Sequence, residues 1–144
     1  MGLVTFDETN ASPPDCGNSW QISETIPYAG GAQCDINAPY YPKASIMGVF
    51  TDLDPQVASS PADRKIEWRF EGTAPFRRLI VSFYHLGVFG VPGCSIPAPT
   101  TFQIVVYEST GLIEVFIENK TCFSNFPPGN RAILGIQTGP ATRQ

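Results

Sequence analysis

Few side chains in this sequence stand at spacings that could support catalysis. His85 is the only histidine, so a Ser-His-acid site would have to include it, with Ser82 as the serine of the same segment. Residues three apart on a strand project to opposite faces, so this pair is not expected to meet. Glu114 and Glu118 share a face but lie about 13 Å apart along a strand, beyond the carboxylate spacing of a glycosidase. We therefore expect no catalytic residues and no enzymatic activity.

Asp52 and Asp54, in the run Thr-Asp-Leu-Asp-Pro, are the weak candidates for a metal site. Two carboxylates at a strand end could supply hard oxygen ligands to Ca²⁺. The alternative is turn chemistry, in which aspartates accept backbone hydrogen bonds before Pro55. We favour the turn, because the other ligands of a six-oxygen shell cannot be identified. No cofactor is expected, with Ca²⁺ as the alternative.

The four cysteines, Cys16, Cys34, Cys94 and Cys122, contain no C-x-x-C pair and lie far from the histidine in sequence, which disfavours zinc. Sequential pairing is one of three connectivities, and the hairpin between Cys94 and Cys122 favours it. Each such disulfide would stabilise the fold by about 3–4 kcal/mol in the chain-entropy model. Four free thiols in a cytosolic protein are the alternative.

Two apolar runs, Phe102–Tyr107 and Leu112–Ile117, flank a polar break and predict a β-hairpin. A turn centred between Ser109 and Thr110 gives one wholly apolar face across the pair. Its members are Phe102, Ile104, Val106, Ile113, Val115 and Ile117. The other face is mixed and includes Tyr107, Glu114 and Phe116, so it is either the outside of the sheet or a contact surface.

A second hairpin is predicted upstream, where Lys65–Glu71 alternates strictly between charged and apolar residues and the chain returns through Phe76–Leu86. We place Arg69 opposite Arg78. Ile66, Trp68 and Phe70 then share a core face with Leu79, Val81 and Phe83. The charged face is most simply solvated.

Further strands are expected at Leu3–Phe6, Trp20–Glu24, Ala44–Thr51 and Arg131–Gln137, which makes about eight in all. The spacing predicts an all-β fold, an antiparallel sandwich of jelly-roll type, forming a single domain over residues 1–144. The expected interior is Trp20, Ile22, Ile46, Val49 or Phe50, Trp68, Phe70, Leu79, Val81, Phe83, Ile104, Val106, Ile113, Val115, Ile133 and Ile136.

Composition and charge limit the classes of partner and the cellular locations expected for the protein. The chain of 144 residues has a net charge of −4, whereas a nucleic-acid module would normally carry a basic surface. No run approaches the roughly 18 apolar residues of a membrane span. The disulfides imply an oxidising compartment, so we expect an extracellular or cell-surface location and a chain excised from a larger protein.

Several motifs in sequence order resemble a β-sandwich domain of large surface and secreted proteins of Bacteroidetes. They are Ala44–Pro55, Phe70–Ser82, Gln103–Glu108, Leu112–Asn119 with Cys122, and Gly129–Gln137. Such domains tend to lie beside PKD-like repeats, in chains that often end in a gliding-motility or type IX sorting region. The resemblance implies cell-surface export and adhesin-type architecture, and brings no catalytic residues. The hairpin content also resembles nidogen-type extracellular domains, a weaker likeness.

Two function classes follow. The first is a non-catalytic module of a surface adhesin that binds glycan or protein, or spaces other domains of the same chain. The second is a carbohydrate-binding accessory domain of a secreted polysaccharide hydrolase. Candidate ligand platforms are the loop aromatics Tyr40, Tyr41, Phe89 and Phe126, since flat rings stack on sugar faces. Packing of these rings onto the sandwich ends is the alternative.

Overall fold

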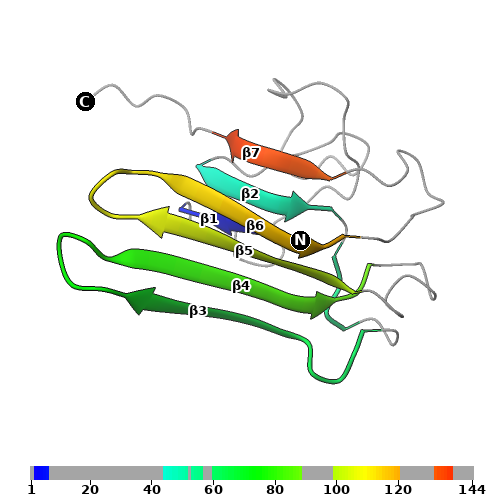
Figure 1. The fold of residues 1–144 in the computed structure, drawn as a ribbon. Coiled ribbons are helices and arrows are strands. Elements are labelled where there is room, and N and C mark those ends of the chain that lie inside the picture. Colours follow the sequence, from blue (N-terminus) through cyan, green and yellow to red (C-terminus); the bar gives the residue numbers. More distant parts are fainter. Residues whose placement is uncertain are drawn as a thin grey trace. The chain divides into compact units, whose positions relative to one another are not determined.

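The computed structural model describes residues 2–6, 44–51, 53–56, 60–88, 99–120 and 132–137. Within these ranges the regular elements are all β-strands, in two antiparallel sheets (Figure 1). The strands are β1 (Leu3–Thr5), β2 (Ser45–Phe50), β3 (Lys65–Glu71), β4 (Arg78–Leu86), β5 (Thr100–Tyr107), β6 (Ile113–Asn119) and β7 (Ile133–Gln137). The all-β prediction is confirmed. A search of the same ranges finds no helix with the length and hydropathy needed to cross a membrane.

The sheets belong to two compact units of the chain. Met1–Thr51 and Phe126–Gln144 form one unit, which holds the three-stranded sheet β1-β2-β7. Asp52–Asn125 forms the other, which holds the four-stranded sheet β3-β4-β5-β6. The expected strand at Trp20–Glu24 lies outside the described residues. The single-domain organisation stays a prediction.

The β5–β6 hairpin has the predicted register. Phe102 pairs with Ile117, Ile104 with Val115, and Val106 with Ile113. The turn is closed by backbone hydrogen bonds from Tyr107 N to Leu112 O, 2.9 Å, and from Gly111 N to Tyr107 O, 3.0 Å. Gly111 has φ +64°, a left-handed conformation that glycine adopts without a steric penalty. The apolar alternation and the turn residue therefore specify the same hairpin.

The predicted register of the β3–β4 hairpin was wrong by two residues. Arg69 lies opposite Ile80, and Arg78 lies opposite Glu71. The shift of two preserves the faces, since side chains alternate with a period of two. It also replaces a like-charged Arg–Arg pair with an ion pair, in which Arg78 Nη2 contacts Glu71 Oε2 at 2.6 Å. Electrostatics thus favours the observed register.

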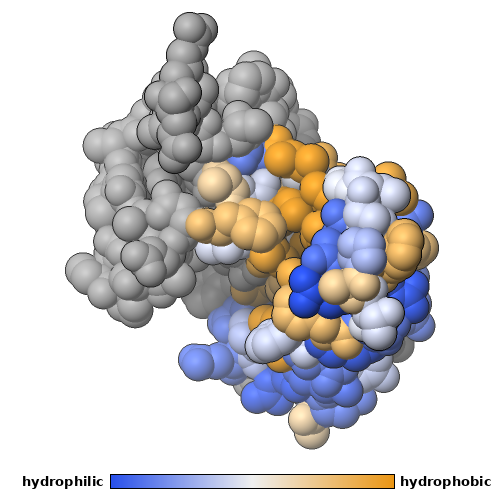
Figure 2. All heavy atoms as spheres, turned by 90° about the vertical axis from the view of Figure 1, so that its left-hand side faces the viewer, coloured by the Kyte–Doolittle hydropathy of each residue, from blue (hydrophilic) through white to orange (hydrophobic). Residues whose placement is uncertain are grey.

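Burial in the four-stranded sheet follows the position of a strand within it. On the apolar face of central strands β4 and β5, Phe83 and Phe102 stack at 4.4 Å and are almost completely buried. On edge strand β3, Trp68 and Phe70 are 68% and 63% exposed, so their predicted place in the core was wrong. An edge strand has a neighbour on one side only. Figure 2 shows patches of hydrophobic residues on the described surface beside larger hydrophilic areas.

The three-stranded sheet is organised around β2, whose six residues are all buried. Met47, Phe50 and Ile133 form a cluster against which Leu3 packs. The prediction that Ile46 and Ile133 are buried is confirmed, whereas Ile136 is 62% exposed and was wrongly placed in the interior. Ile133 and Ile136 differ by three positions on β7 and so project to opposite faces.

Candidate functional site

Most of the residues that the sequence singled out lie outside the described ranges. The disulfide pairing therefore stays a prediction. The ligand-binding role of the loop aromatics and the Ca²⁺-binding role of one of the two aspartates stay predictions as well. These residues are Cys16, Cys34, Cys94, Cys122, Tyr40, Tyr41, Phe89, Phe126 and Asp52.

Asp54 is the described member of the aspartate pair, and its contacts are those of a turn. Its Oδ1 accepts a hydrogen bond from the backbone N of Gln56 at 2.7 Å, and its backbone O accepts one from Ser60 Oγ at 3.1 Å. An aspartate that bonds the backbone two residues on is the signature of an Asx turn. The described ranges contain no group of three or more His, Cys, Asp or Glu placed to hold a metal ion.

Two β-bulges face each other across β5 at Thr101. On β4 the pairing slips between Phe83 and Leu86, and on β6 it slips opposite Thr101 and Phe102, at Glu118. A bulge inserts an extra residue, bends the strand and re-aims the side chains beside it. The two irregularities therefore shape one spot on the sheet.

The bulge in β4 carries an unusual histidine. His85 has φ +52°, and its ring stacks on Tyr84 at 3.7 Å. Its backbone N donates to Thr101 Oγ1 at 3.2 Å, and its ring Nδ1 lies 2.9 Å from Asp63 Oδ2. This hydrogen bond holds the pKa of the Asp63 carboxyl below its usual value.

The bulge changes one premise of the sequence argument about Ser82 and His85, although the Ser82 hydroxyl contacts Gln103 and the His85 ring contacts Asp63. Simple alternation separates Ser82 from His85, but alternation does not hold across an inserted residue. Tyr84 lies two residues from Ser82 and shares its face, and the His85 ring stacks on Tyr84.

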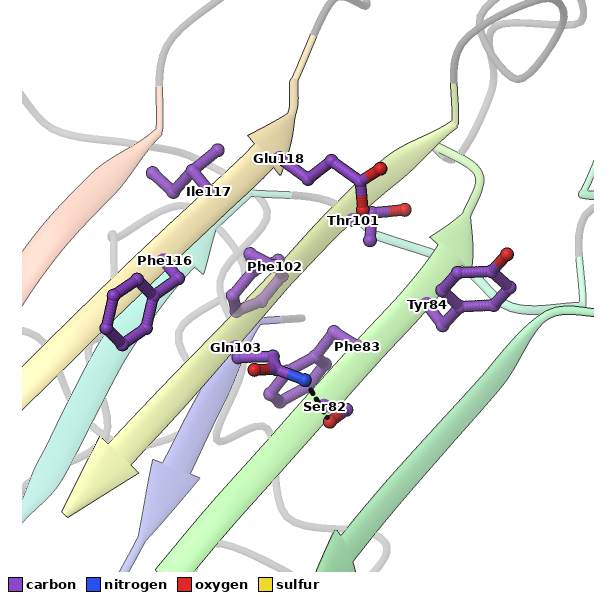
Figure 3. Close-up of a pocket in the computed structure, with 9 residues that line it drawn as sticks. All are labelled: Ser82, Phe83, Tyr84, Thr101, Phe102, Gln103, Phe116, Ile117 and Glu118. Atoms are coloured by element: carbon purple, nitrogen blue, oxygen red, sulfur yellow. Dashed lines mark hydrogen bonds between the residues drawn. The ribbon is translucent and has the colours of Figure 1, made fainter.

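An open hollow of about 470 Å³ lies on the polar face of β4, β5 and β6, next to the bulges. Figure 3 shows two rows of side chains across the three strands. They are Phe116, Gln103 and Ser82 in one row, and Glu118, Thr101 and Tyr84 in the next. Between them the lining includes Phe83, Phe102 and Ile117.

The hollow combines exposed aromatic surface with fixed polar groups. The Phe116 side chain is 53% exposed at one end of its row. Gln103 Nε2 donates to Ser82 Oγ at 3.0 Å, which orients the amide. Lys65 Nζ lies 5.6 Å from the centre of the Tyr84 ring, within cation–π range. Ser82 and Thr101 are only 6% and 8% exposed, so their hydroxyls act mainly by holding their neighbours in place. The aromatic rings, the Gln103 amide and the Glu118 carboxylate suit the binding of a ligand rich in hydroxyl groups.

One hydrogen bond further along the same face links β5 to β6. The Tyr107 hydroxyl donates to Glu114 Oε2 at 2.7 Å. The bond stabilises the protonated phenol and raises the Tyr107 pKa above its usual value. Glu114 is thereby engaged within the sheet.

The sequence placed Phe116 on a face that is either the outside of the sheet or a contact surface. It did not group Phe116 with the other residues of the hollow, which are Ser82, Tyr84, Thr101 and Gln103. The alternation assigns these residues to the polar faces of their strands. What it lacked was the pairing of β4 with β5, which places Ser82 opposite Gln103. Bulges have no reliable sequence signature, so the placement of His85 beside Tyr84 had no signal.

The comparison with known families assigns the chain. Residues 19–144 match the family described as NIDO related, which covers most of the sequence. The chain belongs to the NIDO-related family. The family description agrees with the weaker resemblance of the hairpins to nidogen-type extracellular domains. No curated protein and no solved structure matches this NIDO-related chain. The resemblance to Bacteroidetes surface proteins stays a prediction.

Proposed function

We propose that this NIDO-related chain is a non-catalytic extracellular module of a bacterial cell-surface, adhesin-like protein, and that it binds a glycan on its four-stranded sheet. The observation that carries the proposal is the hollow on β4, β5 and β6, where exposed Phe116 shares a face with Ser82 and Gln103. No cofactor is needed for such binding.

The chemistry of the hollow matches a sugar better than an apolar ligand. A sugar ring offers an apolar C–H face to an aromatic side chain and hydroxyls to donors and acceptors around it. Phe83 and Phe102, which also line the hollow, are stacked and buried and hold β4 and β5 together. A preorganised surface loses less conformational entropy on binding.

The cell-surface location rests on two sequence arguments. The proposed disulfides Cys16–Cys34 and Cys94–Cys122 require an oxidising compartment. The resemblance to Bacteroidetes surface domains implies export, neighbouring PKD-like repeats and a gliding-motility or type IX sorting region. A jelly-roll-like β-sandwich is the fold proposed for the whole chain.

The same hollow also fits the alternative function, a carbohydrate-binding accessory domain of a secreted polysaccharide hydrolase. Both functions use the same glycan contact, and the parent protein distinguishes them. Adjacent repeats and a sorting tail in the full open reading frame would indicate an adhesin. A linked hydrolase domain would indicate the accessory role.

A glycan array followed by calorimetry with the best-bound glycan tests the proposal. We expect Phe116→Ala to weaken binding at least about tenfold, which is about 1.4 kcal/mol. The matched control is Phe76→Ala, because Phe76 is a phenylalanine that is 76% exposed in the β3–β4 turn, away from the hollow.

An array without hits, or equal affinity of the Phe116→Ala and Phe76→Ala variants, would contradict glycan binding on this face. Protein binding or a spacer role would then replace it. Binding to another domain of the parent protein would separate these two outcomes.

A further inference from the structure

Strand β3 presents an open edge. Among the described residues it is paired with β4 alone, at the end of the sheet order β3-β4-β5-β6 (Figure 1). The six residues from Lys65 to Phe70 are all exposed. In an antiparallel strand, alternate residues direct both their N–H and C=O groups to the same side. The outer edge of β3 therefore offers a set of backbone groups that another strand could pair with.

The two faces of β3 have opposite character. Ile66, Trp68 and Phe70 project from one face and are 52%, 68% and 63% exposed. The rings of Trp68 and Phe70 contact each other edge-on, with centroids 5.7 Å apart. Covering an exposed apolar cluster of this kind lowers the free energy, so the cluster marks a surface suited to a partner.

The other face carries charges of alternating sign, Lys65, Glu67, Arg69 and Glu71. In the single chain they pair along the strand, with Lys65 Nζ 3.1 Å from Glu67 and Arg69 Nε 2.7 Å from Glu71. Exposed pairs of this kind contribute little to stability by themselves. Glu71 is also paired with Arg78 of β4. All these ion pairs are exposed to solvent, so their charges can share or exchange partners across an interface.

The order of these charges complements itself when two copies of β3 run antiparallel and meet at Trp68. Lys65 of each copy then lies opposite Glu71 of the other, and Glu67 opposite Arg69, which gives four pairs of opposite charge. On the other face Trp68 meets Trp68, and Ile66 meets Phe70. Directly opposed side chains in antiparallel pairs lie about 5 Å apart, close enough for both kinds of contact.

Neighbouring registers lose this match. Centring the pair on Glu67 sets Glu67 against itself and Lys65 against Arg69. Centring it on Arg69 sets Arg69 against itself and Glu67 against Glu71. Like charges directly opposite are destabilising. A slip by an odd number of residues places charged side chains opposite apolar ones. The register centred on Trp68 is thus selected by both faces.

We propose that this protein forms a homodimer by antiparallel pairing of two β3 edges about a two-fold axis at Trp68, which joins the two four-stranded sheets into one of eight strands. The proposal does not depend on glycan binding. The same patch is used on both copies, so the assembly closes at two.

The other edge of the sheet is a poorer partner. Pairing β3 with β6 of a second copy, with Trp68 opposite Val115, would match Arg69 with Glu114 and Lys65 with Glu118 but leave Glu67 opposite Phe116. β6 is also interrupted by the bulge at Glu118. This contact joins different patches, so it builds an open chain of copies instead of a closed pair.

Charge exchange at the centre of β3 tests the proposal by sedimentation velocity over a range of protein concentrations. We expect Glu67→Arg to raise the dimer dissociation constant at least about tenfold, because the introduced guanidinium then faces Arg69 in both symmetric positions. The double variant E67R/R69E should restore the dimer, since each new charge again meets its opposite. Leu112→Ser, an exposed site on another segment, is the matched control.

Two sedimentation results would exclude the β3–β3 dimer. A wild-type protein that stays monomeric at millimolar concentration would overturn it. So would a dimer that Glu67→Arg leaves intact and E67R/R69E dissociates, because that pattern belongs to β3–β6 pairing. Tryptophan fluorescence gives an independent readout. Burial of Trp68 should shift the emission to shorter wavelength as concentration rises, and Trp68→Phe should abolish the shift.

Discussion

At His85 the backbone takes a conformation that side chains other than glycine rarely adopt. Its φ of +52° places the residue in the left-handed region, which costs an L-residue about 1–2 kcal/mol. The contacts that hold it there are the bond to Thr101, the stack on Tyr84 and the bond to Asp63. Strain at a bulge beside a surface hollow is a common feature of functional sites.

We expect His85→Gly to be more stable than His85→Ala, by about 1 kcal/mol, as measured by chemical denaturation. Both variants lose the ring contacts, so the difference isolates the backbone. At Leu134, an exposed position on β7 without positive φ, the order should reverse, since glycine weakens a regular strand. Equal stability of the two His85 variants would contradict the strain.

The residue scale is where the sequence predicted least. The alternation assigned Phe116 and Ser82 to the correct faces of their strands, but Ser82 is buried and not solvated as expected. The bulge at His85 also altered the local geometry. One inserted residue shifts the phase of all that follow it in the strand. The Asp63–His85 contact joins positions 22 residues apart, and no local pattern indicates it.

At the scale of elements, the two hairpin turns share one reason for glycine, and the β3–β4 turn has a second. Gly72 has φ +83° and Gly111 has φ +64°, so both need left-handed backbone. A Cβ at Gly72 would lie 2.6 Å from the backbone O of Phe76, whereas a Cβ at Gly111 would meet nothing within 4 Å. The β3–β4 turn is thus closed around Gly72, and the β5–β6 turn is open around Gly111.

Gly72→Ala should therefore destabilise the protein more than Gly111→Ala. We expect a cost of about 1 kcal/mol at Gly111, from the left-handed backbone alone. At Gly72 the loss should exceed this by about 1 kcal/mol or more, because backbone atoms must move. Thermal denaturation of the two variants compares them directly. An equal loss of thermal stability in the two variants would contradict the close contact at Gly72.

Element identity and facing were predictable because both follow from the spacing of apolar residues. Each expected strand that falls within the described residues is present, and the β5–β6 register is the predicted one. The β3–β4 register was not, because it depends on the length of the turn. Whether β3 lies at an edge or in the centre also has no local signal, and this is why Trp68 was assigned to the core.

At the scale of the whole molecule, three carboxyl groups of the four-stranded unit have a lowered pKa for a shared reason. Asp63 is hydrogen-bonded to His85, Glu71 to Arg69 and Arg78, and Glu108 to Arg77. Arg77 Nε donates to Glu108 Oε2 at 2.9 Å, which ties the start of β4 to the β5–β6 turn. In each case a cationic or donor partner favours the ionised carboxyl.

These groups predict a loss of stability in acid. Their pKa values are lower in the folded state, so the unfolded chain binds more protons as the pH falls. Their contribution is complete above the ordinary pKa values of 3.8 and 4.5 and disappears as the pH falls through the folded ones. Urea denaturation across this range should give a free energy of unfolding that decreases as the pH is lowered.

Glu108→Gln should make that pH dependence shallower and lower the stability at neutral pH. Arg77→Gln should flatten the profile in the same direction but by less, because the backbone N of residue 77 still donates to Glu108 Oε2 and keeps part of the lowered pKa. A slope for Arg77→Gln that equals that of the unsubstituted protein would show that the Arg77 side chain is not the cause of the Glu108 shift.

The sequence by itself determined the all-β class, the position of the described strands and which side chains share a face, because these follow from a period of two along the chain. Tertiary structure alone decided which strands are edges, where bulges re-aim side chains, and how Phe116, Gln103 and Ser82 come into one row. Those features depend on pairing between distant segments, and pairing is set by the register of the whole sheet. The order of charges along β3 can be seen in the sequence. It becomes available for pairing with a second copy only because the tertiary structure places β3 at an edge of the sheet.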